Sequence, residues 1–218
     1  MWTKLTRILG VVVALSALSW ACTAPATDLQ EGRNYRRLQS PQPVETGGKM
    51  EVIEFFSYGC PHCAHFEPVL GPWVKKLPAD VQFRRVPALF QPGWSELARV
   101  YYTLDTMGKA EELSTAVFKA IHSDNIQLKQ DQVFFDWAAK QGLDRQKVAD
   151  IYNSFAVNSK LSRAKSQAQA YRIEGVPSMA IDGKYFVDGA LAGSYPAWLE
   201  IADALIVKER QERSGKKS

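Results

Sequence analysis

The chain has 218 residues, of which 46% are hydrophobic and 23% are charged. These fractions are typical of a folded globular protein and exclude a disordered or fibrous chain. Of the 27 basic residues, Lys4 and Arg7 lie in a distinct first segment, which leaves 25 against 23 acidic residues. A charge so nearly balanced gives no reason to expect a nucleic-acid partner.

The first segment, residues 1–26, has the order of a secretory signal. Lys4 and Arg7 form a basic start, Ile8–Leu18 is almost wholly apolar, and small residues follow at Ser19, Ala21, Ala24 and Ala26. The apolar stretch is too short to cross a bilayer comfortably as a mature helix. We therefore predict a signal peptide, with a buried N-terminal helix as the alternative.

The position of cleavage decides the fate of Cys22. Cleavage after Ala26 removes this cysteine, whereas a lipoprotein signal that ends before Cys22 would leave it as a lipid-anchored N-terminus. Trp20 stands where bacterial lipoprotein signals usually have a small residue. The sequence thus predicts a periplasmic protein that is soluble unless it is anchored through Cys22.

A strand and a helix are predicted around the remaining two cysteines. Glu51–Ser57 is rich in strand formers with apolar side chains on both faces, which indicates a central strand covered on both sides. A helix should begin at Cys60 or Pro61, since proline suits the first helical position. Pro68 and the pair Gly71-Pro72 are expected to kink or interrupt this helix.

The rest of the mature chain shows a helical block between strands. Helical spacing dominates residues 95–172, where Asp131 is a candidate helix cap. Further strands are predicted near Tyr35–Leu38 and at Val81–Val86, Ser178–Ile181 and Tyr185–Val187, with a hairpin turn at Asp182-Gly183 and a last helix from Tyr195 to about Arg210. We predict an α/β domain made of residues 27–94 and 173–218, with an all-helical domain inserted at 95–172.

Cys60 and Cys63 form a CxxC pair. On the first turn of a helix, this spacing brings the two sulfurs close enough to bond. Unpaired backbone N–H groups and the helix dipole favour a thiolate on Cys60, and His62 adds a donor or a positive charge. Because exchange proceeds by attack of a thiolate on a disulfide, we expect Cys60 to be an accessible nucleophile and Cys63 a buried resolving thiol. Stabilising the reduced form makes the disulfide more oxidising, which the dipeptide Pro61-His62 favours.

Two simpler interpretations of the pair remain. A structural disulfide is one, although a four-residue loop offers little entropic stabilisation. A zinc site with His62 and His65 is the other, although the sequence has no second CxxC or HxxxH group to complete four ligands. We expect no metal and no cofactor, and we expect His65 to be an ordinary residue of the helix surface.

Two further features point toward the cysteine pair. Glu54 interrupts an apolar run that leads into the active-site turn, where a buried carboxyl could accept a proton from Cys63. The alternative is an edge strand with Glu54 in water. Val176-Pro177 precedes a predicted strand; a cis bond there would expose the Val176 backbone for a substrate to pair with, although a trans loop proline is the default.

These residues together resemble the DsbA family of periplasmic thiol–disulfide oxidoreductases. The matching stretches are Glu54-Phe55-Phe56-Ser57, Cys60-Pro61-His62-Cys63 with Phe66-Glu67, Gly175-Val176-Pro177 and Gly183-Lys184-Tyr185. The resemblance extends from about Glu31 onward and implies a thioredoxin-like fold interrupted by a helical domain. The resemblance to this family also implies a strongly depressed pKa of the first cysteine, so the direction expected for Cys60 is not independent of it.

The resemblance also implies roles and partners. It makes Cys60–Cys63 the redox-active disulfide, Pro177 the cis-proline and Glu54 the buried acid. Reduced exported proteins would be the substrates, and a quinone-linked, DsbB-like protein of the inner membrane would reoxidise the pair. We expect a monomer, since the lead-in of roughly twenty residues is too short for the dimerisation domain usual in reductases and isomerases. A reductase or isomerase, and a non-catalytic binding module for unfolded chains, are the alternative functions.

Overall fold

The computed structural model describes residues 27–215, so the predicted signal peptide and Cys22 lie outside the described part. A five-stranded sheet with the order β1-β5-β4-β2-β3 forms its centre. The strands are β1 (Arg36–Arg37), β2 (Met50–Phe56), β3 (Val81–Pro87), β4 (Ser178–Ile181) and β5 (Tyr185–Asp188). β2 runs parallel to β3 and antiparallel to β4, and all seven of its residues are buried. The predicted central strand is therefore confirmed, and the edge-strand alternative for Glu54 is wrong.

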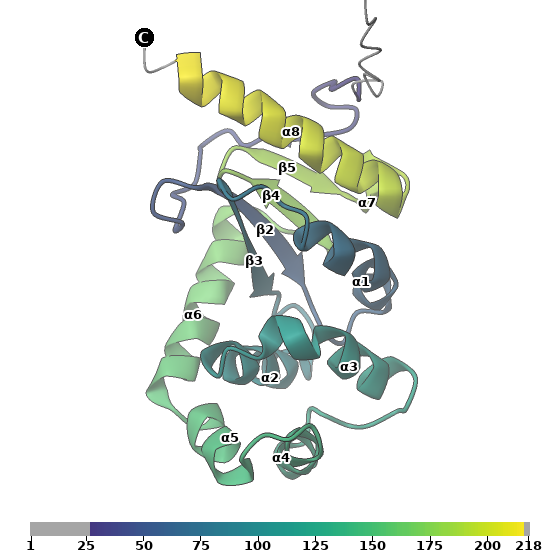
Figure 1. Cartoon of the computed structure of the whole chain (residues 1–218), viewed down its shortest axis with the longest axis vertical. Coiled ribbons are helices and arrows are strands. Elements are labelled where there is room, and N and C mark those ends of the chain that lie inside the picture. The colour runs from purple at the N-terminus through teal and green to yellow at the C-terminus, as the bar shows by residue number, and fades with distance from the viewer. Residues whose placement is uncertain (1–26, 216–218) are drawn as a thin grey trace, which may run out of the picture.

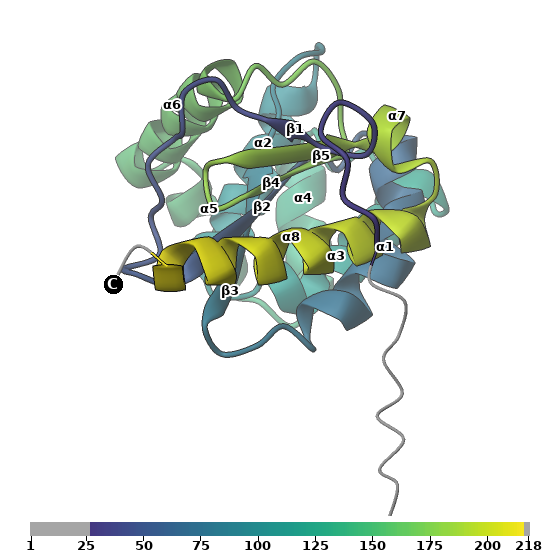
Figure 2. The same cartoon turned by 90° about the horizontal axis from the view of Figure 1, so that it is seen from above.

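Helices cover both faces of this sheet. They are α1 (Pro61–Val74), α2 (Trp94–Thr106), α3 (Ala110–His122), α4 (Asp131–Lys140), α5 (Arg145–Tyr152), α6 (Phe155–Ala170), α7 (Gly189–Ala192) and α8 (Tyr195–Gly215). Helices α1 and α8 lie over one face and α6 over the other, as the view from above shows (Figure 2). Helices α2–α6 follow one another between β3 and β4; α2–α5 form the lower part of the molecule, and α6 runs from there up beside the sheet (Figure 1). This is the thioredoxin-like architecture with helices inserted before the β-hairpin.

One local prediction was wrong and another was wrong in part. The expected interruption of α1 does not occur, because the helix continues through Pro68 and Pro72 to Val74. Each proline removes one intrahelical donor, and packing of α1 against α3 and α8 offsets that loss. Asp131 does not cap α4: the cap position is Gln130, and the Asp131 carboxylate instead accepts a hydrogen bond from the Tyr152 hydroxyl.

The hairpin turn between β4 and β5 was predicted correctly. Asp182 and Gly183 both have positive φ, +52° and +64°, as the turn type requires. A Cβ atom on Gly183 would lie 2.1 Å from the carbonyl oxygen of Gln42, so no other residue fits there without moving the neighbouring loop. The turn thereby fixes the register of β4, the strand that begins directly after Pro177.

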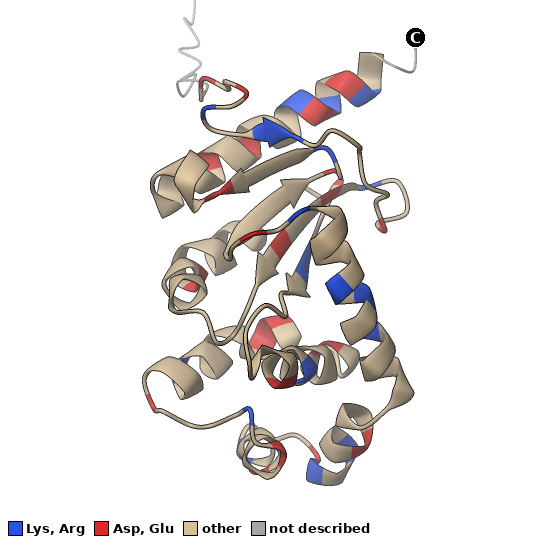
Figure 3. Ribbon diagram, turned by 180° about the vertical axis from the view of Figure 1, so that it is seen from behind, with Lys and Arg blue, Asp and Glu red and all other residues tan. Residues whose placement is uncertain are grey.

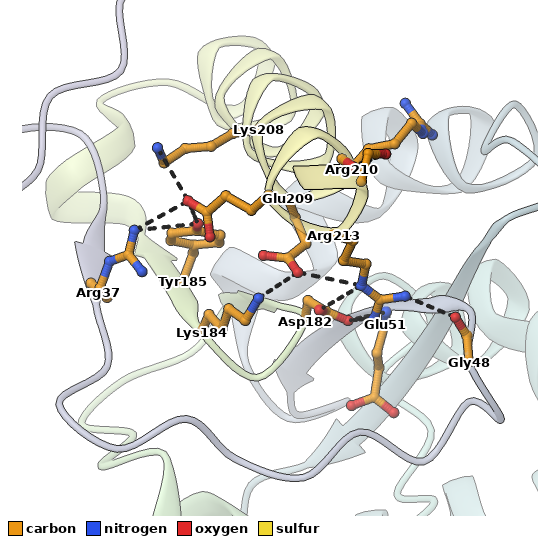
Figure 4. A network of polar contacts seen from close by, with 12 residues as sticks. Arg37, Gly48, Glu51, Asp182, Lys184, Tyr185, Lys208, Glu209, Arg210 and Arg213 are labelled. Atoms are coloured by element: carbon orange, nitrogen blue, oxygen red, sulfur yellow. Dashed lines mark hydrogen bonds and ion pairs between the residues drawn. The ribbon is translucent and has the colours of Figure 1, made fainter. Parts of the chain in front are cut away.

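A buried ionic cluster fastens the end of α8 to this hairpin (Figure 4). Glu209 is fully buried and accepts hydrogen bonds from Lys184 and Arg213. Arg213 also pairs with Asp182 and donates to the carbonyl oxygen of Gly48. Because each buried charge has a partner of opposite sign, the cluster holds helix, hairpin and lead-in loop together.

Candidate active site

The cysteine pair lies where a central strand ends and a helix begins. Cys60 is the N-cap of α1, with extended backbone angles, and Pro61 is the first helical residue. Both cysteines are free thiols, and Cys63 is 1% exposed, which agrees with a buried second thiol. Cys60 is only 5% exposed, so the expectation of an openly accessible residue was too strong. The Val176 carbonyl oxygen, 3.4 Å from its Sγ atom, accounts for part of this cover.

The surroundings of the two thiols shift their pKa values in opposite directions. The pKa of Cys60 is lowered to about 6, first by a hydrogen bond from Cys63, and further by the backbone N–H groups of Cys63 and His62 and the His62 charge, against an opposing effect of burial. The pKa of Cys63 is raised well above its ordinary value, mainly by burial. At neutral pH the pair is therefore arranged so that Cys60 carries the negative charge and Cys63 the proton.

The reduced protein is expected to show thiolate absorbance with a midpoint near pH 6, and not near the ordinary cysteine value. Since folding depresses this pKa, the reduced form loses stability as the pH falls through 6. A pKa near 6 corresponds to about 1.4 kcal/mol of stabilisation gained between pH 5 and pH 7. Absorbance at 240 nm and urea unfolding of the reduced protein at both pH values measure the two effects. A midpoint above pH 8 would contradict the assignment.

Val176-Pro177 lies directly against the cysteine pair. The peptide bond between them is cis, and Pro177 precedes β4. Beside this segment lies a groove of about 600 Å³. Its lining includes His62, Val176, Pro177, Phe186, Tyr195 and Trp198. Four charged residues, Arg36, Arg172, Glu174 and Asp188, also line it. Apolar rings, one imidazole and charged groups thus border a cavity large enough for a few residues of an extended chain.

Glu54 is buried in the sheet, but it is not alone there. It is 1% exposed, and its Oε2 atom accepts a hydrogen bond of 2.7 Å from Nε of Arg85 on β3. Arg85 also pairs with Glu67 at 2.7 Å and with Glu111 at 3.1 Å. In Figure 3, red and blue segments of adjacent strands lie side by side, in agreement with the register that places Glu54 opposite Arg85. Burial raises the pKa of Glu54 to about 7, although Arg85 opposes the shift.

Arg85 is the site residue that the sequence analysis missed. The signal was present, because Arg84-Arg85 interrupts the strand pattern of Val81–Val86 just as Glu54 interrupts that of β2. In the parallel pair the two residues are register partners, Glu54 opposite Arg85. The sequence thus marks an acidic residue on one predicted strand and a basic residue on another, but their pairing depends on the register of the two strands.

The three histidines of the chain take different places. His62 is exposed and lines the groove, and His65 lies on the exposed surface of α1, as predicted. His122 ends α3, and its Nε2 atom lies 2.8 Å from the carbonyl oxygen of Tyr58. Within residues 27–215, the histidine, cysteine and acidic side chains form no group of three that could hold a metal ion. Over the same residues, no helix combines the length and the apolar character needed to cross a membrane.

Comparisons with known proteins find relatives that match nearly the whole chain. The family model of the DSBA-like thioredoxin domain matches residues 79–193. The thiol:disulfide interchange protein DsbA of Pseudomonas aeruginosa is 43% identical over 203 residues, which cover 93% of this chain and 96% of that protein. The DsbA of Bordetella parapertussis is 40% identical over 210 residues, or 96% of this chain and 99% of that protein.

Solved structures give the same result in three dimensions. The crystal structure of Pseudomonas aeruginosa DsbA superimposes with a TM-score of 0.82 at 44% identity, covering 87% of this chain and 98% of that one. The DsbA of Xylella fastidiosa superimposes with a TM-score of 0.78 at 30% identity, covering 84% and 98%. The chain therefore belongs to the DsbA family of thiol:disulfide interchange proteins.

Proposed function

We propose that the oxidised Cys60–Cys63 pair donates its disulfide to reduced proteins in the periplasm. A substrate thiolate attacks Sγ of Cys60, the Cys60–Cys63 bond breaks, and Cys63 leaves as a thiolate that takes up a proton. A second substrate thiolate then attacks the mixed disulfide and releases Cys60 as a thiolate. The substrate has lost two electrons to the cysteine pair. The observation that carries the proposal is the place of Cys60 at the N-terminus of α1, where the Cys63 hydrogen bond and the backbone N–H groups of Cys63 and His62 lower its pKa to about 6, because a stable thiolate is a good leaving group.

The residues around Cys60 support distinct parts of this reaction. Pro61 starts α1 directly after the nucleophile, and the His62 charge lowers the pKa of Cys60. The backbone of Val176, held beside the sulfur ahead of Pro177, offers an edge with which an extended substrate can pair. Such pairing would place a substrate thiol next to Sγ of Cys60 without any need for a particular substrate sequence.

Glu54 is suited to exchange the proton of Cys63. Its pKa near 7 lets it hold or release a proton at neutral pH, and its charge contributes to the raised pKa of Cys63. When Cys63 leaves as a thiolate in a buried position, a nearby proton donor favours that step. When the pair is reoxidised, the same carboxylate can take the proton back.

The wider setting follows from the family and from the sequence. We infer that residues 1–26 direct export and are removed, or that cleavage before Cys22 leaves a lipid anchor. The mature chain works as a monomer in which residues 95–172 form the inserted domain. After each turnover, a quinone-linked, DsbB-like protein of the inner membrane restores the Cys60–Cys63 disulfide.

Oxidation of a reduced test protein by purified residues 27–218 tests the proposal. The wild-type chain should form native disulfides catalytically in the presence of a small disulfide, and Cys60→Ser should show no catalysis. Equilibration with glutathione gives the direction, because an oxidase stays reduced in all but strongly oxidising buffers. A pair that remains oxidised in strongly reducing buffer would identify a reductase. A binding module would give a different result. The wild-type chain would then oxidise no substrate, and both it and Cys60→Ser would prevent aggregation equally well.

A further inference from the structure

Two backbone carbonyl groups near Cys60 are held by side chains from distant parts of the chain. The carbonyl of Tyr58, two residues before Cys60, accepts a hydrogen bond of 2.8 Å from Nε2 of His122. The carbonyl of His62, two residues after Cys60, accepts one of 3.0 Å from the Tyr195 hydroxyl. The first donor ends helix α3 of the insertion, and the second begins helix α8. Neither donor belongs to the cysteine motif.

His122 is one of several residues of the inserted helices that contact the turn before Cys60. Because its partner is a carbonyl oxygen, the Nε2 atom of His122 must carry a proton. One turn earlier on α3, Phe118 packs edge-on against the Tyr58 ring with 5.0 Å between ring centres, and Tyr58 is 1% exposed. A Cβ atom on Gly59 would lie 2.8 Å from Nε1 of Trp94 on α2. Helices α2 and α3 of the insertion therefore pack directly against the turn that precedes Cys60.

Tyr195 restrains the backbone that follows Cys60, as His122 restrains the backbone that precedes it. The Tyr195 ring stacks on Phe66 of α1 with 5.1 Å between ring centres, and Phe66 stacks in turn on Trp198 at 4.9 Å. This packing fixes the ring, so the hydroxyl has little freedom to leave the His62 carbonyl. Tyr195 thereby ties the first turn of α1 to α8, the helix that is anchored to the β4–β5 hairpin.

We propose that His122 and Tyr195 are positioning residues that hold the backbone on both sides of Cys60 and so keep the Cys60–Cys63 disulfide strongly oxidising. This inference rests on the proposed function. The Cys60 thiolate exists only in the reduced form and depends on the aligned N–H groups of His62 and Cys63. In the oxidised form, the covalent bond itself restrains the two residues. Loosening the backbone therefore costs the reduced form more than the oxidised form, which makes the disulfide less oxidising.

Four single variants of the mature chain, and a double variant that combines Tyr195→Phe with His122→Phe, test this. Tyr195→Phe removes one hydroxyl and keeps the stacked ring, and His122→Phe removes the donor and keeps a ring. His122→Gln restores an N–H donor and should recover most of the wild-type behaviour. Lys119→Gln, on the same helix turn, is the matched control, since among residues 27–215 Lys119 pairs only with the exposed Asp124. The readouts are the pH midpoint of Cys60 ionisation and the equilibrium with glutathione.

Tyr195→Phe and His122→Phe should each raise the Cys60 midpoint by about half a pH unit, which shifts the glutathione equilibrium at pH 7 about threefold toward the oxidised protein. That shift corresponds to about 14 mV at 29.6 mV per tenfold change. The double variant should shift further, and Lys119→Gln should match wild type. The inference is overturned if both variants keep the wild-type midpoint and equilibrium and lose stability equally in the oxidised and reduced forms.

The test separates this inference from the proposed function. The equilibrium of the wild-type chain alone decides whether the pair is an oxidant, whatever the variants do. Tyr195→Phe lacks one partly exposed oxygen atom and should fold even if His122→Phe does not, so it decides the outcome for the α8 side alone. A wild-type midpoint and equilibrium in a folded Tyr195→Phe protein would remove Tyr195 from the proposal.

Discussion

Replacement of Cys63 by serine is expected to abolish disulfide donation and to make Cys60 accumulate in mixed disulfides. The variant cannot form the Cys60–Cys63 bond, so it has no oxidising equivalent to give. The serine hydroxyl can donate the hydrogen bond that the Cys63 thiol gave, and the backbone N–H groups remain, so the pKa of Cys60 stays below its ordinary value and Cys60 attacks a disulfide readily. No neighbouring thiol then resolves the product. Mass spectrometry after incubation with a disulfide-bonded peptide should find one peptide attached per protein chain.

The reciprocal variant is the control for this experiment. In Cys60→Ser the remaining thiol, Cys63, is 1% exposed and has a raised pKa, so it should capture almost no peptide at pH 7. The ratio of the two capture rates should exceed tenfold, because both access and thiolate fraction favour Cys60. Equal capture by the two variants would contradict the assignment of nucleophile and resolving thiol.

The elements around the cysteine pair were predictable because their causes are local. The apolar run in Glu51–Ser57, the proline after Cys60 and the Asp182-Gly183 turn each act within a few residues, and β2, α1 and the hairpin appear where these signals stand. Glu54 was also predictable as a buried acid, since its neighbours on both sides are apolar. Local causes failed only where packing overrides them, as in the uninterrupted helix through Pro68.

The partners of these residues were not predictable, because they depend on how distant elements meet. Arg85 lies 31 residues from Glu54 and meets it only through the register of β2 and β3. His122 and Tyr195 reach their carbonyl partners across 64 and 133 residues. The low exposure of Cys60 has the same origin, since the Val176 oxygen that covers it comes from a segment 116 residues away. Sequence patterns identify the groups that react, and tertiary packing decides their environment.

Substitution of Arg85 by methionine is expected to lower the free energy of unfolding by about 3–5 kcal/mol at pH 7, because removal of the cation leaves buried carboxylates without a partner. The Arg85 side chain is fully buried and neutralises Glu54 and Glu67, whose side chains are 2% and 6% exposed. Methionine fills part of the space but leaves both carboxyl groups without their cation. Urea unfolding of oxidised wild type and variant at pH 7 measures the loss.

The same substitution should show a distinct dependence on pH. Without Arg85, the folded pKa of Glu54 rises above its already raised value near 7, while the unfolded pKa stays near 4.5. A group with a raised folded pKa stabilises the fold below its unfolded pKa and loses that contribution as the pH rises through the folded value. The stability deficit of Arg85→Met should therefore shrink as the pH is lowered from 7 to 5.

A second substitution tests whether the unpaired carboxylate of Glu54 causes the loss of stability. Adding Glu54→Gln to Arg85→Met removes the unpaired charge and should recover part of the stability, so the two changes should not be additive. Arg210→Met is the matched control: it breaks an exposed ion pair with Asp80 and should cost at most about 1 kcal/mol. If Arg85→Met behaved like Arg210→Met, the buried ion pair would contribute little, and the pKa of Glu54 would have to be set by burial alone.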